Sequence, residues 1–517
     1  MPMLPVTTGP DQPPPAPIVQ AAAPVLSRLD VESHGYTYVV LGNTLLSEAE
    51  VRRALSQAKT PRDALADLRA AYLARGYFLV ALVAKVDQQQ VLLRVVQGRL
   101  THIDGPEDIA RFFEGLKNDE AVRSSDVVRR SLLAQAYAAT NGKQPQIGFK
   151  PAPEVGGSTM QIEQKDAPDQ RPVGASLTYG NYGNRYAGHQ LAQAQFYARH
   201  DGFSLQANYS RALTGMDENT RGAYYAAGGA TLSWVNPWGI YQVDDQYTKY
   251  ELGKAFAPLY PVGRIHVWGL SGTQYLYADD RTRWTVSEGA HAIHDQETVF
   301  QGFYTLRNQR YFVTDLGTDA SWRVAGLAGR PASLAVGAQV KWGGARAADG
   351  FSPGTGNPTP HFRIYGFNAS VSQALAHDYV ASFSLNGQHS TDILPSYEQW
   401  VLGGLNNIAA YLPGTVVGDR GYLARAALQA PQWSLGPLRW RPTLYGEYGT
   451  ARYTYVPPKS PTWQRLADLG LSLNLDLPAA GLSAMLSYAK PVGASGVARS
   501  YRAGQRSHLF FYLQAAF

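Results

Sequence analysis

Residues 469–477, LGLSLNLDL, decide the fold of this 517-residue chain. Leucine occupies every second position, and glycine, serine, asparagine and aspartate stand between. A period of two predicts a β-strand with one apolar and one polar face. Residues 332–342, ASLAVGAQVKW, alternate in the same way, and from about residue 172 this pattern replaces helical periodicity. The larger, C-terminal part of the chain is therefore predicted to be antiparallel β-structure.

The lengths of the connections favour a membrane barrel over a soluble all-β protein, which stays the alternative. The turns SLGP (434–437) and PAAG (478–481) are short, whereas YVPPKSPT (455–462) and PVGASGVARSYRAG (491–504) are long. Short turns alternating with long loops are typical of outer-membrane barrels. The candidate strands number 16 or 17, and bacterial barrels have even counts, so we predict a transmembrane β-barrel of about 16 antiparallel strands.

The composition agrees with a barrel. Charged residues make up 17% and hydrophobic residues 45%, with 32 tyrosines and 51 glycines. No apolar run reaches the roughly 18 residues of a transmembrane helix. The chain has no cysteine, which excludes disulfides and thiolate metal sites. The formal charge of +6 includes no run of five basic residues, which indicates a solvated surface and predicts no nucleic-acid partner.

The N-terminal third has helical periodicity and an internal repeat. One helix is predicted to begin at a capping box formed by Ser47 and Glu50, and a second at Pro61. The N-terminus lacks the charged and apolar regions of a signal peptide, as expected of a mature form with an added start. We predict four parts: a proline-rich segment (1–32), a β-α-α-β-β domain (33–100), a second, looser copy (101–168) and the barrel (169–517).

Four local matches carry a resemblance to a known family. In chain order they are AYLARGY (71–77) with VLLRVVQGRL (91–100), SLLAQAY (131–137) with FKPAPEVGGSTMQIE (149–163), TYGNYGNRYAG (178–188), and SYEQWVLGG (396–404) with GDRGYLARA (418–426) and YGEYG (445–449). The chain resembles the two-partner-secretion transporters, the TpsB proteins of the BamA-related superfamily. The two α+β domains are then similar to periplasmic POTRA domains, and the long loop at about 390–420 is similar to the family's sixth external loop.

The sixth loop departs from the family pattern at its tip. Relatives carry (V/I)RG(Y/F) there, and the arginine reaches across the lumen to the aspartate of F-x-D-x-G. Aligned on the preceding glycine pair, the tip in this chain consists of Ile408, Ala409, Ala410 and Tyr411, without the arginine.

The matching lumen motif is Tyr445, Glu447 and Gly449, with glutamate in place of aspartate. An alternative position for the arginine motif is 419–422, DRGY, directly at the start of the next strand.

A different partner is predicted for the lumen glutamate. Alternation places Glu447 and Arg425 on the lumen faces of consecutive strands, and the short turn near 435–436 places them opposite each other. Because an unpaired buried carboxylate is costly, we predict a cross-strand Arg425–Glu447 pair. The alternative is that each charge meets water. With the predicted pair, the loop would be held by Tyr411 and by neutral contacts, not by a salt bridge.

The resemblance implies export of a secreted partner protein, without ATP, from the periplasm to the surface of a Gram-negative bacterium. It also implies contact with outer-membrane lipids and with the barrel assembly machinery through Phe517. A partner strand is predicted to add to an exposed sheet edge of a POTRA-like domain. The candidate strand contains Leu92, Leu93, Val95 and Val96, which are alternatively ordinary core. The other functions considered are a BamA- or TamA-like assembly factor and a porin.

No catalytic chemistry is predicted. The sequence contains no phosphate-binding loop, dinucleotide fingerprint or metalloprotease motif. His291 and His294 are three apart in a strand and therefore point to opposite faces, so they are not predicted to share a metal. His389 and Asp392 are predicted to be polar loop residues. We expect no enzyme activity, no metal and no cofactor.

Overall fold

The structure is a computed structural model. It describes residues 27–167, 171–216, 222–346, 349–456, 461–506 and 508–517. The predictions for residues 1–26 lie outside the described residues. The chain divides into two compact units. The first contains the described residues up to Thr101 with 118–123 and 151–158, and the second contains the rest of the described chain through Phe517.

The first α+β domain packs two helices on one four-stranded sheet. Its elements are β1 (Arg28–Ser33), β2 (Tyr36–Leu41), α1 (Glu48–Ser56), α2 (Pro61–Ala74), β3 (Ala81–Asp87) and β4 (Gln90–Val96), with sheet order β1-β2-β4-β3. Strand β1 was not predicted, because its residues 28–32 were assigned to the proline-rich segment. It pairs along β2, so the sheet has four strands.

The predicted helix starts are confirmed. Ser47 and Glu50 form a capping box at α1, and Pro61 is at the first position of α2. The hydrogen bonds from the Ser47 backbone and hydroxyl, with the Arg75 guanidinium, lower the pKa of Glu50 to about 2. The core side chains Leu55, Leu68 and Leu93 are fully buried between helices and sheet.

The second α+β domain has one long helix and a three-stranded sheet of order β5-β7-β6. Its elements are β5 (Arg99–Asp104), α3 (Glu107–Ala110), η1 (Glu114–Leu116), α4 (Ser124–Thr140), β6 (Lys143–Pro151) and β7 (Gly157–Asp166). The sequence VLLRVVQGRL (91–100) favours one continuous strand, but in the structure it contains most of β4 and the start of β5. The break falls at Gly98, which packs too closely on the Leu79 backbone to admit a side chain.

The sequence EDIARFFEGLK (107–117) favours one continuous helix, but in the structure this segment is interrupted. It contains only α3 and η1, because Phe112 and Phe113 are both fully buried and Arg130 of α4 donates to the Phe112 carbonyl at 3.0 Å. Among the helices in the described residues, none is both long and apolar enough to cross a membrane.

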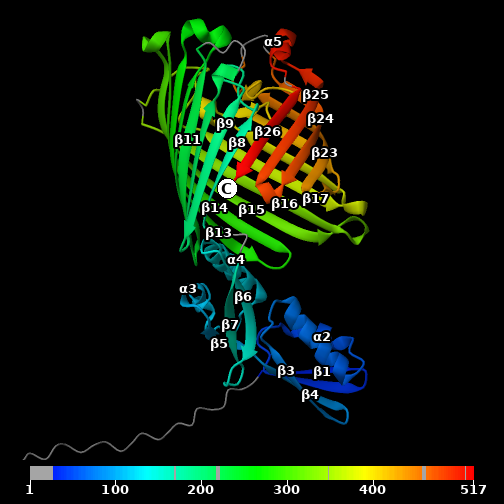
Figure 1. Ribbon diagram of the computed structural model, residues 1–517. Coiled ribbons are helices and arrows are strands. Elements are labelled where there is room, and N and C mark those ends of the chain that lie inside the picture. The colour runs from blue at the N-terminus through cyan, green and yellow to red at the C-terminus, as the bar shows by residue number, and fades with distance from the viewer. Residues whose placement is uncertain (1–26, 168–170, 217–221, 347–348, 457–460, 507) are drawn as a thin grey trace, which may run out of the picture. The chain divides into compact units, whose positions relative to one another are not determined.

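Sixteen antiparallel strands close a barrel in the described part of the chain, as predicted. Figure 1 shows the last strand lying beside the first. The strands are β8 (Val173–Gly180), β9 (Leu191–His200), β10 (Phe203–Ala212), β11 (Tyr224–Asn236), β12 (Gly239–Glu251), β13 (Val262–Ala278), β14 (Thr282–Val299), β15 (Tyr304–Ala325), β16 (Pro331–Gly344), β17 (Arg363–Ala374), β18 (Val380–His389), β21 (Arg420–Gln429) with its continuation β22 (Trp433–Leu435), β23 (Leu438–Arg452), β24 (Gln464–Leu477), β25 (Leu482–Ser495) and β26 (Leu509–Ala516).

The two faces of the barrel wall differ as the alternation predicts. Leu469 and Leu471 of β24 and Leu444 of β23 remain more than half exposed on the outside. Tyr445 and Glu447, which alternate with Leu444, are buried inside. A closed barrel has no unpaired edge, and an apolar outer surface is the surface that lipid requires.

Candidate functional site

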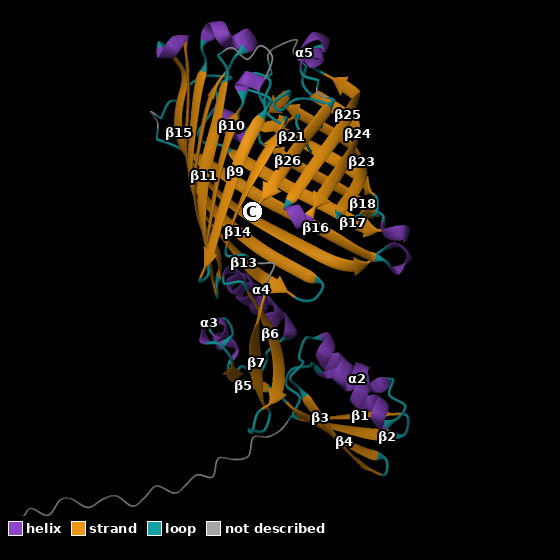
Figure 2. Cartoon of the chain, in the orientation of Figure 1, coloured by secondary structure: helices purple, strands orange, loops and turns teal. Residues whose placement is uncertain are grey.

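The loop that joins β18 to β21, residues 390–419, folds into the barrel. It contains η7 (Ser396–Glu398) and the two short paired strands β19 (Trp400–Leu402) and β20 (Val416–Gly418). At its tip, Ile408, Ala409, Ala410 and Tyr411 are at most 1% exposed. Figure 2 shows β18 and β21, the two strands that this loop joins, in the barrel wall. The predicted sixth-loop tip is thus fully enclosed, as are Leu394, Leu402 and Asp419 elsewhere in this loop.

Two backbone amides fix the tip to the barrel wall. The Ala409 N–H donates to Glu447 Oε2 at 3.0 Å, and the Ala410 N–H donates to Asp468 Oδ2 at 2.7 Å. Glu447 on β23 and Asp468 on β24 stand directly opposite each other and are 3% and 1% exposed. Two neutral amides therefore take the place of the missing loop arginine.

Arg425 and Glu447 lie opposite each other on β21 and β23. Arg425 Nη1 is 2.7 Å from Glu447 Oε1, and the Glu447 side chain is fully buried. The same nitrogen donates to Asn406 Oδ1 of the loop at 2.9 Å, and the guanidinium lies 4.5 Å from the centre of the Tyr445 ring. The wall arginine thus bridges a wall carboxylate and the loop.

Each residue of the lumen motif has a distinct contact. Tyr445 Oη on β23 is 2.7 Å from Ser487 Oγ on β25. Glu447 holds the loop as described above. Gly449 leaves room for the loop, because a side chain there would meet Ile408 Cδ1 at 2.6 Å and Leu402. Ile408 itself has a positive φ of 64°, which is strained for a β-branched residue and is kept by the packing around it.

The alternative motif position, 419–422, has another role in the structure. Arg420 stands opposite Arg452, well away from Glu447 along the strands. Asp419 is fully buried and accepts the N–H groups of Leu394 at 3.0 Å and Thr454 at 2.7 Å. It therefore anchors the base of the loop, which the sequence analysis did not foresee.

The tip packs in an apolar cluster and touches two other loops. Leu402, Tyr411 and Leu412 of the loop pack with wall residues such as Leu466 and Phe510. The Leu412 N–H donates to the Gln505 carbonyl, beyond the short helix α5 (Arg499–Gly504), at 2.8 Å. Asn184 of the first loop donates to the Pro413 carbonyl at 3.3 Å.

The strand proposed for partner capture is not at a sheet edge. β4 is paired with β2 on one side and with β3 on the other, so it has no free edge for another strand. Leu93 and Val95 are core residues, while Leu92 and Val96 on the opposite face are half-buried. The free edges of this sheet are β1 and β3, and β3 exposes Val83 and Val86 by more than half.

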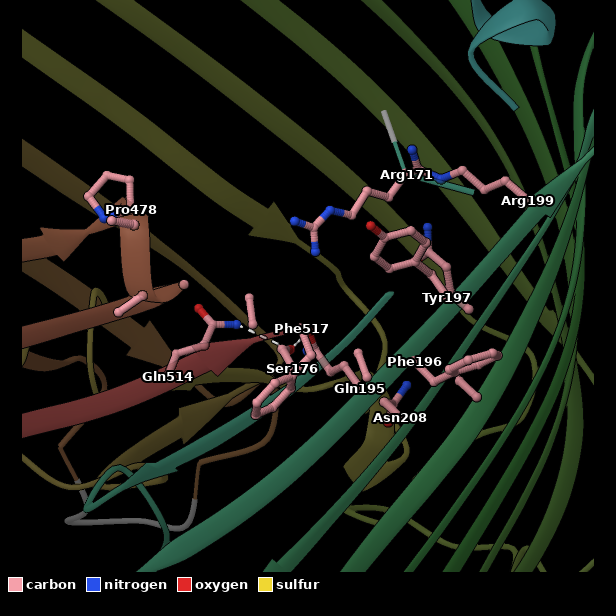
Figure 3. A pocket seen from close by; sticks show the side chains of 17 residues that line it. Arg171, Ser176, Gln195, Phe196, Tyr197, Arg199, Asn208, Pro478, Gln514 and Phe517 are labelled. Carbon is pink, nitrogen blue, oxygen red and sulfur yellow. Dashed lines mark hydrogen bonds between the residues drawn. The ribbon is translucent and has the colours of Figure 1, made fainter. Parts of the chain in front are cut away.

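A cavity of about 810 Å³ lies where β8 and β26 close the barrel, near the short turn 478–481. Figure 3 shows that its lining includes Arg171, Arg199 and Gln514. Gln514 donates to Ser176 Oγ at 3.3 Å across the seam. Nothing in the sequence pattern had marked this polar pocket.

The histidines that were considered as metal ligands are apart. His291 Nε2 is 3.2 Å from Asp315 Oδ2, whereas His294 Nε2 is 2.8 Å from Asn308 Oδ1 on the other face of the wall. Within the described residues no group of three or more His, Cys, Asp or Glu side chains is arranged to hold a metal. Asp392 accepts the Arg363 N–H at 2.8 Å and so connects the loop to the start of β17.

The fold is similar to that of two solved proteins. CdiB from Escherichia coli superposes with a TM-score of 0.75 at 15% identity, covering 98% of this chain and 93% of that chain. CdiB from Acinetobacter baumannii gives 0.69 at 13% identity, covering 99% and 95%. No curated protein matches the sequence. The family model described as haemolysin secretion/activation protein ShlB/FhaC/HecB matches residues 156–475, more than half of the chain, and the chain therefore belongs to this family.

Proposed function

We propose that this outer-membrane transporter, which carries a partner protein from the periplasm to the cell surface without ATP, divides the work among three parts. The first α+β domain captures the extended partner in the periplasm. The barrel provides the path through the membrane, and the loop 390–419 closes that path at rest. The family consists of transporters rather than enzymes. Partner binding and partner folding outside the cell supply the free energy.

The observation that carries the proposal is the seat of the loop tip. A 16-strand barrel is wide enough for an aqueous channel, so an unplugged lumen would leak. The tip contacts are two amide–carboxylate hydrogen bonds, one arginine bridge and an apolar cluster. Such contacts hold a loop at rest and can be released together, because none of them is covalent.

Shortening the loop tests the plug. We expect deletion of residues 405–414 to raise the conductance of the barrel in planar bilayers several-fold, with the heat-modifiable migration of a folded barrel retained. Deleting residues 254–259 of another loop, η3 (Lys254–Leu259), serves as the matched control and should leave conductance unchanged. An unchanged conductance in the 405–414 deletion would contradict the plug.

Partner capture is assigned to β3 of the first domain. An extended chain adds to a free sheet edge through main-chain hydrogen bonds, and exposed apolar side chains beside that edge favour the addition. Charged side chains on an edge oppose it. We therefore expect Val83→Lys with Val86→Lys to reduce secretion of the partner strongly. The control Val155→Lys changes a valine that is 87% exposed in the turn between β6 and β7. Normal secretion by the Val83/Val86 variant would rule out β3.

Lipid and assembly contacts complete the proposal. The apolar outer face meets outer-membrane lipids, and the barrel assembly machinery reads the end of β26 through Phe517, which is 64% exposed. Phe517→Ser should lower the amount of folded barrel in the outer membrane without changing the conductance of each barrel that does insert. An undiminished yield of folded barrel would remove this role.

One observation favours a second function, the assembly of other barrels. The closing seam pairs only five residues of β26 with β8, whereas β14 and β15 pair over eighteen. A short seam is expected of a barrel that opens sideways. Depletion of this protein should then lower the levels of other outer-membrane barrels, while a dedicated exporter leaves those levels unchanged and loses only its partner.

A further inference from the structure

Basic side chains gather on the outer face of the barrel near the long loops. They are Lys249 on β12, Arg264 and His266 on β13, His294 on β14 and Arg310 on β15, here called the basic patch. Ser287 lines a lumen cavity with Trp400 of the inner loop, so odd-numbered residues of β14 face inward and His294 faces outward. His294 stands opposite His266 and Arg310, which therefore face outward too, as does Arg264 two residues from His266.

Aromatic belts show where the membrane lies on these strands. Trp268 and Phe312 are 50% and 63% exposed on the long-loop side, and Tyr277 and Trp284 are 40% and 46% exposed on the short-turn side. With a rise of about 3.3 Å per residue and a tilt of about 40°, the stretch from Trp268 to Tyr277 spans on the order of 23 Å. That height matches the apolar band of an outer-membrane barrel, about 25 Å.

The basic patch lies just beyond this band. Arg264 is two outward positions above Trp268, and Arg310 is one outward position above Phe312. Lipid headgroups begin at this height, because the aromatic belts mark the interfaces. Lys249, Arg264 and Arg310 therefore face the headgroups of the external leaflet.

Protein anions neutralise only part of the patch. Lys249 is 2.9 Å from Glu251, and His266 Nε2 is 2.5 Å from Asp245 Oδ1. Arg264 and Arg310 have no side-chain partner among the described residues, and both are exposed. Arg264 also stands directly opposite Lys249, and like charges in such a pair are destabilising unless an anion lies between them.

We propose that the basic patch binds the phosphate groups of lipids in the external leaflet of the outer membrane. This inference rests on the proposed contact with outer-membrane lipids and specifies its chemistry and place. Guanidinium groups bind phosphate oxygens through paired, charge-assisted hydrogen bonds. A lipid fits better than a soluble anion, because the two free arginines stand on a lipid-facing wall directly above exposed aromatic rings. The lipid is thus held by its phosphates above and by Trp268 and Phe312 below.

Binding of purified lipopolysaccharide to the full chain in neutral detergent tests the proposal. We expect Arg264→Gln with Arg310→Gln to weaken binding roughly five-fold, the size expected for the loss of exposed ion pairs. Arg264→Lys with Arg310→Lys should keep most of the affinity. The matched control is Arg439→Gln, an exposed arginine next to a short turn. Heat-modifiable migration verifies that each variant is folded.

Three results would overturn the proposal. They are unchanged binding by the double glutamine variant, equal binding of dephosphorylated lipopolysaccharide, and displacement by inorganic phosphate at a concentration equal to that of the lipid. The last result would identify a simple anion site instead of a lipid site. Secretion of the partner is measured in parallel, so that loss of lipid binding with normal secretion contradicts neither export nor the plug.

Discussion

Two charged clusters in the lumen each contain one central arginine. The first connects strands of the wall with one another, and the second connects the wall with the loop. Arg307 on β15 bonds Asp295 and Glu297 of β14, both at 2.7 Å, and Tyr250 of β12 at 3.1 Å. Every member of this first cluster belongs to the wall. Arg425 on β21 bonds wall residue Glu447 and also Asn406 of the loop. The first cluster closes the wall on itself, whereas the second fastens a loop to the wall.

The difference shows how the tip of the loop is held without a charge of its own, although Glu398 elsewhere in the loop pairs with Lys341 of β16 at 3.3 Å. In the second cluster the charges stay on the wall, where neighbouring strands fix them, and the loop offers only backbone N–H groups and an asparagine. A tip that leaves this site leaves no unpaired charged side chain of its own in the lumen. Disturbing the second cluster should therefore change gating, while disturbing the first should change only stability.

The largest contrast is expected from removing the shared carboxylate. Glu447→Ala removes the partner of Arg425 and the acceptor of Ala409, and breaking a buried pair costs about 3–5 kcal/mol. We expect a several-fold rise in single-channel conductance. Asp295→Ala is the matched change in the first cluster and should lower the unfolding temperature with conductance unchanged. If Asp295→Ala opened the channel equally, the two clusters would not differ in function.

The sequence predicted much of this site because a short turn fixes a register. The turn before β23 places Arg425 opposite Glu447, and the structure has them in that register. Asp468 was missed, because β23 and β24 are joined by a long loop that does not fix which residues oppose each other. Ala409 and Ala410 were identified as the tip, but it is their backbone N–H groups that bind the two carboxylates. Every residue except proline has a backbone N–H, so such donors cannot be recognised from the sequence.

The order of strands in the first domain was missed for a related reason. β4 pairs parallel to β2 and antiparallel to β3, and the parallel partner is set by how α1 and α2 cross the sheet. Alternation identifies Leu93 and Val95 as one face of a strand, but it does not say whether that strand is central. The edge β3 therefore emerged only from the structure.

The next effect concerns the second amide of the tip. Asp468→Ala leaves the Ala410 N–H without its acceptor, and an unsatisfied buried donor costs about 1–3 kcal/mol. We expect a smaller rise in conductance than for Glu447→Ala, because Glu447, Arg425 and the apolar cluster still hold the tip. The two substitutions combined should exceed either one, and a conductance equal to that of wild type for Asp468→Ala would show that this bond does not restrain the loop.

A smaller effect is expected where a lumen contact does not involve the loop. Tyr445→Phe removes only the hydrogen bond to Ser487 on β25, which contributes about 1 kcal/mol. The aromatic ring still lies beside Arg425. Thermal unfolding should shift slightly to lower temperature, and conductance should not change. A gating effect of this variant would mean that wall and loop contacts in this region are not separable.

The smallest expected effect is a decrease in conductance or none at all, opposite in direction to the increase expected for Glu447→Ala and Asp468→Ala. Asp468→Asn keeps an oxygen that accepts the Ala410 N–H, and it removes one of two carboxylates that stand directly opposite each other beside a single arginine. Like charges in that position are destabilising by up to about 1 kcal/mol. Asp468 Oδ1 has no hydrogen-bond partner among the described residues, so an amide nitrogen in its place breaks no hydrogen bond of that atom. We expect Asp468→Asn to hold the loop at least as firmly as wild type, with conductance unchanged or lower and slightly higher thermal stability. If Asp468→Asn opened the channel as Asp468→Ala does, the negative charge itself, and not the acceptor oxygen, would be what holds the tip.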